Sequence, residues 1–299
     1  MTIIVCSYNA RQVIENSLNS LGHQHTSDDY EVIVVDSGED GTAGFVRAVF
    51  PEVRLVRSRR RLWPGAARNL GIRCSRAPFI SFVPADGEAS RQFVAARLDK
   101  HRHGYPLVGG TVTDGYPRSI VGRAAYQLEF SALQPSARLL ARQAVPHALS
   151  YSRQVFDRLG LFPEDVRTGE DSVFNERCMA AGLRCAFEER AQVSHHNPRS
   201  LREFLLHEVE HGRGLASCTF LHRHPSALGP LSGGPARVIP NVFMRYPTVT
   251  WANAVQHLWP DKRRCLSYLG LSPLIAAGLL ATASGTWAEW RYQRRRTMQ

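Results

Sequence analysis

The sequence contains few cysteines, and they form no pattern that indicates a disulfide framework or a metal site. The six are scattered, without a C-x-x-C pair or a zinc spacing. They are Cys6, Cys74, Cys178, Cys185, Cys218 and Cys265. The first residues also lack a basic leader followed by an apolar signal segment. We therefore expect reduced cytosolic thiols and an N-terminal part that stays in the cytoplasm.

Two common nucleotide-binding motifs are missing as well. No G-x-G-x-x-G follows the first apolar segment, and no G-x-x-x-x-G-K-[ST] occurs in the chain. Dinucleotide and P-loop sites therefore lose their main support. The sequence also has no internal repeat and no low-complexity tract.

What is present is an ordinary globular composition with an excess of positive charge. The 299 residues are 43% hydrophobic and 21% charged, enough for one large or two modest domains. A formal net charge of +11 favours anionic partners such as nucleotide phosphates, an acidic lipid surface or nucleic acid. The arginine-rich segments 57–61 and 291–296 are far apart, and no basic stripe alternates with aromatic residues. We therefore expect no nucleic-acid partner.

The first eighty residues alternate between apolar runs and helical patterns. The runs are TIIVCSYN (2–9), EVIVVDSGEDG (31–41), VRLV (53–56) and FISFV (79–83). Apolar residues at helical spacing occupy 13–21, and GAARNLGI (65–72) opens another helix. Strands without polar alternation are typical of a parallel sheet covered on both faces. The sequence therefore predicts an α/β fold with a Rossmann-like nucleotide-binding half.

Charged residues follow these strands where an open α/β sheet binds its ligands. Asp36 follows the second strand, Asp86 the fourth, and Arg68 lies on the helix between them. Carboxylates accept hydrogen bonds from a base or a ribose, and arginine donates to carbonyl or phosphate oxygens, a combination that suits a nucleotide. From its own segment, Asp86 is either a ligand of a metal or ribose, or a turn residue that bonds its own backbone before Gly87.

Six segments, in order, resemble those of the family 2 glycosyltransferases. They are TIIVCSYNA (2–10), SLNSLGHQ (17–24), EVIVVDSGEDGT (31–42), GAARNLGI (65–72), FISFVPADG (79–87) and TGEDSVFNERCMAAGLRCAF (168–187). The resemblance implies a GT-A fold, with a mostly parallel sheet flanked by helices. It also implies an enzyme that moves a sugar from a nucleotide-diphospho-sugar, UDP- or GDP-linked, to a hydroxyl acceptor with inversion. We expect residues 1–110 to bind the donor, 111–227 to form the acceptor half of the same domain, and 228–299 to form a C-terminal helical region.

The resemblance also assigns roles to single residues. Ser7, Tyr8, Asn9, Asp36 and Arg68 would hold the nucleotide.

Asp86 would bind the Mg²⁺ or Mn²⁺ ion that bridges the diphosphate, and His195 would complete the metal shell, with His196 the weaker choice. Asp171 would be the general base, because a sugar hydroxyl needs a carboxylate to take its proton. By position alone, Asp171 would be an N-cap, and only the resemblance favours the general base.

One departure from the family pattern affects the metal site. Where the family has Asp-x-Asp, this chain has Pro84-Ala85-Asp86, so the first acid is missing. Proline also removes a backbone donor and fixes φ. An alternative is therefore a degenerate GT-A protein that binds nucleotide or glycan without turnover. Glu88 is expected to be a solvated turn residue.

The second half of the chain carries weaker signals. Residues 107–117 predict a strand and a turn-rich excursion, and residues 120–142 a helix that carries Arg123, Arg138 and Arg142. The segment 150–162 resembles the part of the family that introduces the acceptor acid. The later histidines are expected on a helix surface or at lipid headgroups; they are His207, His211, His222 and His224.

The C-terminal region has the composition of a membrane-associated segment. After a Gly/Pro-rich connector (228–240), residues 266–288 carry no formal charge and are about as long as the roughly 20 residues that span a bilayer. Basic residues flank this stretch, and Pro273 interrupts it. We expect an interfacial helix or hairpin on the anionic inner face of the cytoplasmic membrane, with a buried amphipathic helix as the alternative. The acceptor would then be a glycan or a lipid-linked sugar, as in polysaccharide biosynthesis.

Overall fold

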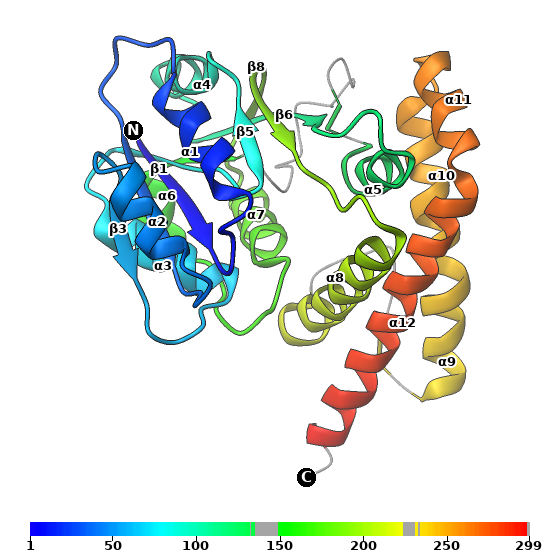
Figure 1. Ribbon diagram of the computed structural model, residues 1–299. Coiled ribbons are helices and arrows are strands. Elements are labelled where there is room, and N and C mark those ends of the chain that lie inside the picture. The colour runs from blue at the N-terminus through cyan, green and yellow to red at the C-terminus, as the bar shows by residue number, and fades with distance from the viewer. Residues whose placement is uncertain (132, 135–148, 224–230, 233, 298–299) are drawn as a thin grey trace. The chain divides into compact units, whose positions relative to one another are not determined.

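A computed structural model describes residues 1–131, 133–134, 149–223, 231–232 and 234–297 (Figure 1). The chain forms two compact units. The first consists of Met1–Thr113, Leu139–Asp165 and Glu170–His195, and the second of Asp114–Arg138, Val166–Gly169 and His196–Gln299.

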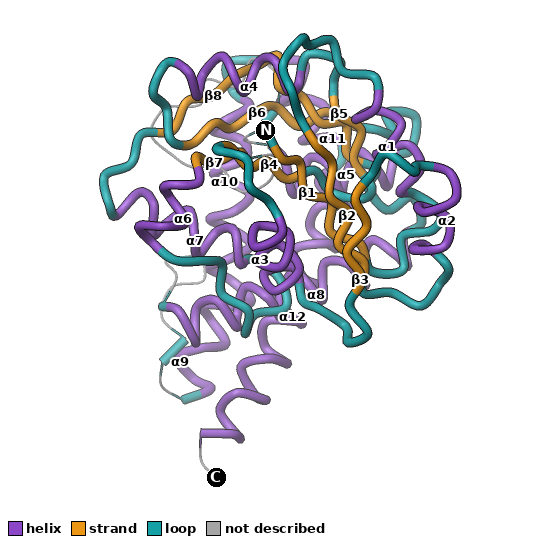
Figure 2. The backbone as a smooth tube through the Cα atoms, turned by 90° about the vertical axis from the view of Figure 1, so that its left-hand side faces the viewer, coloured by secondary structure: helices purple, strands orange, loops and turns teal. Residues whose placement is uncertain are grey.

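The first unit contains an eight-stranded sheet with the order β3-β2-β1-β4-β7-β6-β8-β5 (Figure 2). The strands are β1 (Thr2–Ser7), β2 (Glu31–Asp36), β3 (Arg54–Arg57), β4 (Phe79–Phe82), β5 (Gly87–Ala89), β6 (Leu107–Asp114), β7 (Ser150–Ser152) and β8 (Cys185–His195). The strands β3, β2, β1 and β4 are parallel, as their apolar runs predict. The pairs β4/β7, β6/β7 and β5/β8 are antiparallel. The expected α/β fold is confirmed, and its sheet is mixed.

The helices of this unit connect the strands. They are α1 (Ile14–Gly22), α2 (Thr42–Val49), α3 (Pro64–Cys74), α4 (Phe93–Arg102), α6 (Arg153–Leu159) and α7 (Glu170–Ala180). The apolar stripe of α1 is buried, as its spacing predicts. Pro64 opens α3, where a missing N–H costs nothing. Gly71 lets α3 lie directly on β1, since a Cβ there would come within 2.6 Å of the Ile4 side chain.

Aromatic rings fill the core between α3, α6, α7 and the centre of the sheet. Phe162 lies 4.6 Å from Phe174 between ring centres, and Tyr151 packs edge-on against Phe174 at 5.7 Å. The Tyr151 hydroxyl donates to Asn175 Oδ1 over 2.6 Å, so the buried phenol is satisfied. This core supports the carboxyl ends of the parallel strands.

A second buried cluster is polar and lies on the inner face of α4. His101 stacks on Phe79, and its ring nitrogens lie 2.8 Å from the Tyr105 carbonyl oxygen and 2.8 Å from Ser150 Oγ. Arg97 is fully buried and donates to the Val108 carbonyl oxygen over 2.6 Å. Burial lowers the pKa of His101 to about 4. The imidazole is therefore part of the fold in its neutral form.

The second unit is helical in the part that the structure describes. Its helices are α5 (Ile120–Phe130), α8 (Leu201–His222), α9 (Pro235–Pro240), the π-helical turn η1 (Asn241–Arg245), α10 (Tyr246–Leu258), α11 (Lys262–Gly270) and α12 (Ser272–Thr297). Ser200 and Glu203 form a capping box at the start of α8. The helices α8 and α12 run side by side (Figure 1), and Thr286 Oγ1 donates to the Gly212 carbonyl oxygen over 3.0 Å.

The uncharged stretch 266–288 divides between α11 and α12. One face of it is buried in the second unit, through Tyr268, Ile275, Leu279 and Ala283, whereas Leu266 and Leu280 are exposed. Among the described helices none meets the length and hydropathy of a membrane span alone; α11 and α12 meet them only as a pair bent by 67°. The predicted helix 120–142 is described only as far as α5. Arg138, Arg142 and part of the connector 228–240 lie outside the described residues.

Candidate active site

The carboxyl ends of β1 and β2 bring together two buried oxygen atoms. Ser7 and Asp36 are neighbours in the parallel register, and both side chains are buried. Asp36 Oδ1 accepts a long hydrogen bond from the Gly38 N–H (3.4 Å). Within the described residues, Asp36 Oδ2 and Ser7 Oγ have no hydrogen-bond partner. Because buried polar atoms are rarely left unpaired, this strand edge is suited to a polar ligand.

The loop after β1 is fixed against the loop after β2. Asn9 adopts a left-handed conformation (φ 53°), and its Oδ1 accepts from the Glu39 N–H over 3.0 Å. Gly38 is required there, because a Cβ would collide with the Asn9 backbone. The conformation of Asn9 holds the predicted Ser7-Tyr8-Asn9 segment at the strand edge.

An aromatic stack that the sequence did not predict borders this edge. The Arg61 guanidinium lies 4.2 Å from the centre of the Tyr8 ring and 4.3 Å from that of Trp63. The stack offers flat faces and one positive charge at Tyr8, in the loop that follows Ser7. The only signal in the sequence is the run Arg-Arg-Leu-Trp at 60–63, whose arginines we considered only as a basic segment.

Arg68, which we expected to hold the nucleotide, lies beside two acidic side chains of α7. Its Nη1 lies 3.0 Å from Glu170 Oε1 and 3.5 Å from Asp171 Oδ2. The guanidinium also lies over Phe82 and Phe162, at 5.2 and 5.4 Å from the ring centres. Burial alone would lower the pKa of Arg68, but the two carboxylates outweigh it and raise that pKa. The structure thus places Arg68 as the counter-ion of the Glu-Asp pair.

The Glu-Asp pair opens α7. Asp171 Oδ1 accepts from the Ser172 N–H over 2.7 Å, and both acidic side chains are buried. Burial raises the pKa of Glu170, and the charge of Asp171 adds to this while Arg68 opposes it. Gly65 allows α3 to lie directly against the backbone of Pro163, since a Cβ at position 65 would collide with the Pro163 carbonyl oxygen. A buried acid whose position is fixed by a cation is a candidate proton acceptor.

Asp86 and His195 meet although they are far apart in the sequence. The strand β5 pairs with β8 so that Gly87 lies opposite His195, and Asp86 Oδ1 lies 3.6 Å from His195 Nε2. The Asp86 side chain is 42% exposed and that of His195 11%. Two ligand atoms on one divalent ion at about 2.1 Å each are separated by roughly 3.0–3.4 Å, so a small adjustment would let both bind it. The pair therefore fits the predicted metal ligands in chemistry and spacing.

The segment 84–87 forms a tight turn that leads into β5. The Pro84 carbonyl oxygen accepts from the Gly87 N–H and from Ser17 Oγ, both over 3.1 Å. Gly87 is packed against the Pro84 ring, which a Cβ at position 87 would meet at 2.7 Å. Pro84 therefore replaces the expected acid with a rigid turn. We expected Glu88 in this turn, but the residue lies in β5, where it pairs with Ser194.

Two histidines that we expected on a helix surface or at lipid headgroups lie on α8, with their side chains only partly exposed. His207 and His211 face Glu129 of α5, in the second unit. The sequence does contain a signal, since residues 207–211 are His-Glu-Val-Glu-His, with two histidines four residues apart on one helical face. The partner Glu129 could not be found by spacing, because it is 78 residues upstream of His207. His196 stacks on Tyr116, with 4.8 Å between ring centres.

Comparison with known proteins supplies the family. The profile described as Glycosyl transferase family 2 matches residues 2–160. The succinoglycan biosynthesis protein ExoO of Rhizobium meliloti is 26% identical over 211 residues, which cover 66% of this chain and 60% of that protein. The chain thus spans about 60% of the length of this relative.

Two solved structures share the fold. The mannosyltransferase PcManGT of Pyrobaculum calidifontis, in complex with GDP-Man and Mn²⁺, has a TM-score of 0.62 at 20% identity and covers 96% of this chain and 86% of its own. S. aureus TarS 1-349, in complex with UDP-GlcNAc, has a TM-score of 0.52 at 19% identity and covers 98% and 91%. These likenesses confirm the GT-A fold. Since the family profile covers more than half of the residues, the chain belongs to glycosyl transferase family 2.

Proposed function

We propose that the protein transfers a sugar from a nucleotide-diphospho-sugar to a hydroxyl acceptor, with inversion at the anomeric carbon. The observation that carries this proposal is the approach of His195 to Asp86 across the β5/β8 pair, at 3.6 Å. A turn aspartate that only bonded its own backbone would need no imidazole beside it. An acid and an imidazole together suit an ion of the Mn²⁺ type, which binds oxygen and nitrogen ligands.

The donor nucleotide would lie at the carboxyl ends of β1 and β2. Asp36 Oδ2 and Ser7 Oγ are the buried polar atoms available to a base or ribose. Tyr8 and Asn9 lie in the adjoining loop, and Arg61 extends the flat surface of Tyr8. The neighbouring folds were solved with GDP-Man and with UDP-GlcNAc, which supports a GDP- or UDP-linked donor.

Asp86 and His195 would hold Mg²⁺ or Mn²⁺ on the donor diphosphate. When bound, the cation offsets the negative charge that develops on the leaving diphosphate. The chain supplies one carboxylate to it where the family pattern supplies two, because Pro84 takes the other position. The diphosphate oxygens and water would complete the coordination shell, as is usual for Mg²⁺.

Asp171 would act as the general base. As the acceptor oxygen forms its bond to the anomeric carbon, its proton passes to the Asp171 carboxylate. The bond from that carbon to the diphosphate breaks, and its electron pair leaves with the nucleotide. Arg68 lies 3.5 Å from Asp171 Oδ2 and would act as a positioning residue that keeps the carboxylate ionised.

The acceptor would be a glycan or a lipid-linked sugar at a membrane surface. The named role of the Rhizobium meliloti relative in succinoglycan biosynthesis supports a polysaccharide. Met244, Trp259 and Leu266 are exposed in the second unit, and the exposed Lys262 and Arg263 lie at the start of α11. Exposed apolar and basic side chains together favour an anionic bilayer surface. Sedimentation with anionic vesicles at low salt, and its loss with neutral vesicles, would test this part.

The function is tested with a panel of nucleotides and nucleotide sugars. Thermal unfolding is followed with each ligand, with and without Mn²⁺, and nucleoside diphosphate release is then measured for the ligands that bind. We expect one donor class to raise the unfolding midpoint more with Mn²⁺, and the same donor to be turned over. Binding without any turnover above the D171N background would instead support the alternative that Pro84 raises, a degenerate GT-A protein.

A further inference from the structure

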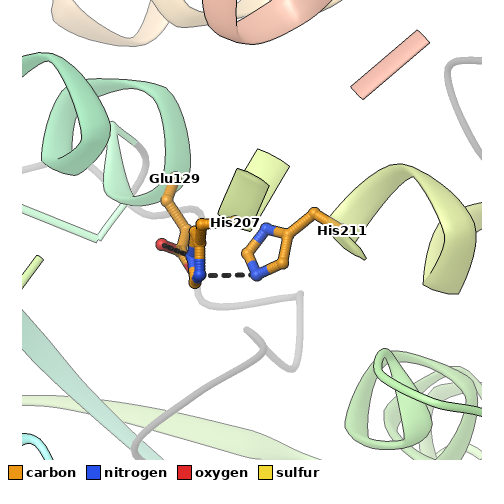
Figure 3. A group of neighbouring side chains, drawn as sticks. All are labelled: Glu129, His207 and His211. Atoms are coloured by element: carbon orange, nitrogen blue, oxygen red, sulfur yellow. Dashed lines mark ion pairs between the residues drawn. The ribbon is translucent and has the colours of Figure 1, made fainter. Parts of the chain in front are cut away.

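The second unit contains a cluster of metal-ligating side chains that the proposed glycosyl transfer does not use. Glu129 of α5 faces His207 and His211 of α8 (Figure 3). His207 Nε2 lies 3.6 Å from Glu129 Oε2, and His211 Nε2 lies 3.9 Å from Glu129 Oε1. One ligand atom from each of the three residues can be chosen so that all lie within 4.8 Å of one another. Three potential ligands from two helices thus converge on one point.

The local structure explains why these side chains converge. His207 and His211 are separated by one helical turn, so both imidazoles project from the same face of α8. Their rings lie 4.2 Å apart between centres. Both belong to a regular helix whose N-terminus carries a capping box. The site is thus built on regular helices, which position ligands more accurately than loops do.

The distances correspond to those of a metal shell that needs little adjustment. Zn²⁺ binds imidazole nitrogen and carboxylate oxygen at about 2.0–2.2 Å, so two ligands of one tetrahedral ion lie about 3.4 Å apart. The two nitrogen–oxygen distances exceed this by about 0.2 and 0.5 Å, each measured to a different oxygen of Glu129, so side-chain rotation would be needed to bring the three ligands onto one ion. The side chains of His207 and His211 are 33% and 30% exposed, and the His207 Nε2 atom itself is buried.

The charges of the cluster also favour a cation. Glu208 follows His207 and is buried, and its Oε2 accepts from Thr282 Oγ1 over 2.9 Å. Glu129 and Glu208 thus place two acidic side chains near two imidazoles, and a divalent cation would offset charge that is costly to bury. In H-E-x-x-H metallopeptidases the glutamate after the first histidine acts as the general base. Here the corresponding residue, Glu208, is hydrogen-bonded to Thr282.

We propose that Glu129, His207 and His211 bind a divalent transition-metal ion, Zn²⁺ by preference, which fastens α5 to α8. Two imidazoles and one carboxylate form a ligand set that Zn²⁺ uses, with water in the fourth position. The second imidazole makes this site better suited to Zn²⁺ than the Asp86–His195 pair, which offers one imidazole and one carboxylate.

The test measures metal binding by the full-length chain after EDTA treatment and removal of the chelator. Zn²⁺ is titrated calorimetrically in excess Mg²⁺, and Co²⁺ is followed by its visible absorption. The same titrations are run on H195Q, which removes the imidazole beside Asp86. We expect one equivalent of Zn²⁺ in both proteins, and an increase of several degrees in the unfolding midpoint when it binds.

Three variants locate the ion. H211Q and E129Q should each weaken Zn²⁺ binding at least tenfold and abolish the midpoint increase. H222Q, from the same helix, is the control and should bind as the wild type does. Far-UV circular dichroism shows whether each variant folds; if H211Q does not, E129Q and the Co²⁺ spectrum of the wild type decide. Failure of the wild type to bind Zn²⁺, binding that survives both ligand variants, or binding lost in H195Q would overturn the proposal.

Discussion

The contacts of Asp171 are compatible with both roles that the sequence alone presents as alternatives, the N-cap and the proposed general base. Its Oδ1 accepts from the Ser172 N–H, as an acid at a helix start commonly bonds the backbone, while Oδ2 faces Arg68. The N-terminal position also favours the ionised carboxylate through the helix dipole. The helix-start contact and the proposed base therefore do not compete, because the contact fixes the orientation that a base requires.

Replacing Asp171 by asparagine should remove transfer while leaving the fold intact. An amide keeps the shape of the side chain but cannot take the acceptor proton, so the rate should fall by about 10²- to 10⁴-fold. Release of nucleoside diphosphate in the presence of acceptor measures the rate, and the thermal shift with donor checks that binding is retained. D157N, an exposed acid on α6, is the control. Full activity of D171N would exclude this residue as the base.

Removing Arg68 should destabilise the first unit strongly. The R68M variant leaves Glu170 and Asp171 buried without their cation, and breaking a buried pair in this way costs about 3–5 kcal/mol. R73M is the matched control on the same helix, because the Arg73–Glu164 pair is 53% and 50% exposed and such pairs contribute only about 0–1 kcal/mol. Urea unfolding measures both. The E170Q change should recover part of the loss in R68M, and an R68M loss no larger than that of R73M would contradict the buried pair.

The residues that sequence analysis located are those whose local pattern carries the information. Apolar runs located β1 to β4, and Asp36 and Asp86 followed from the strand ends. The partner of Arg68 did not follow, because ion pairs between distant segments leave no local pattern. The same holds for Glu129, which is brought to α8 by the packing of the second unit. His195 was placed near Asp86 by motif order, and its 3.6 Å distance rests on a β5/β8 register that no spacing rule gives.

Small residues let the backbones of α8 and α12 lie in direct contact. Gly212 lies against the Thr282 carbonyl group, and Gly285 lies against that of Val209. The carbonyl of Gly212 also accepts from Thr286 Oγ1. Glycine and threonine therefore set the distance between the two backbones. This packing contributes to the burial of Ala283, whereas Tyr268, Ile275 and Leu279 are buried in a cluster with Ala254 and Leu258 of α10.

Substituting Gly212 by alanine should reveal this contact through the sign of its effect. Alanine favours a helix by about 1 kcal/mol over glycine, so a solvent-facing site would be stabilised. At Gly212 the Cβ would collide with Thr282, and the overpacking should destabilise by about 1–3 kcal/mol. G270A is the control, because a Cβ there meets no atom within 4 Å. Thermal unfolding by circular dichroism compares them, and an increased midpoint for G212A would show that the helices are not in contact there.

The protein has a net positive charge, and some of its ionisable side chains are buried. The net charge of +11 is spread over a chain in which several ionisable groups are buried. His101 is one of these, held neutral between Phe79, Ser150 and the Tyr105 carbonyl. Such a group connects the stability of the first unit to pH.

Stability should fall in mild acid because of His101. Its folded pKa is about 4, below the ordinary value of 6.5, so between these values the unfolded chain binds more protons. The stabilisation is complete above pH 6.5 and is lost as pH falls toward 4, up to about 3 kcal/mol. The unfolding free energy in urea at pH 7.5 and 5.0 measures this loss. H101Q should lose less on acidification than the wild type, whereas H103Q, with an exposed ring, should lose as much; equal losses in all three would refute the assignment.

The order of the sheet has a consequence for how the protein is made. The strand β7 lies between β4 and β6, and β8 lies beside β5, although both are synthesised after them. The ribosome therefore synthesises β1 and β2, whose ends form the proposed donor site, early. The edge of β4 stays unpaired until residues 150–152 have been synthesised. His195, the last residue of β8, joins Asp86 only when the sheet closes. A nascent chain would thus complete the proposed nucleotide pocket before the proposed metal site, and would need protection from aggregation in that interval.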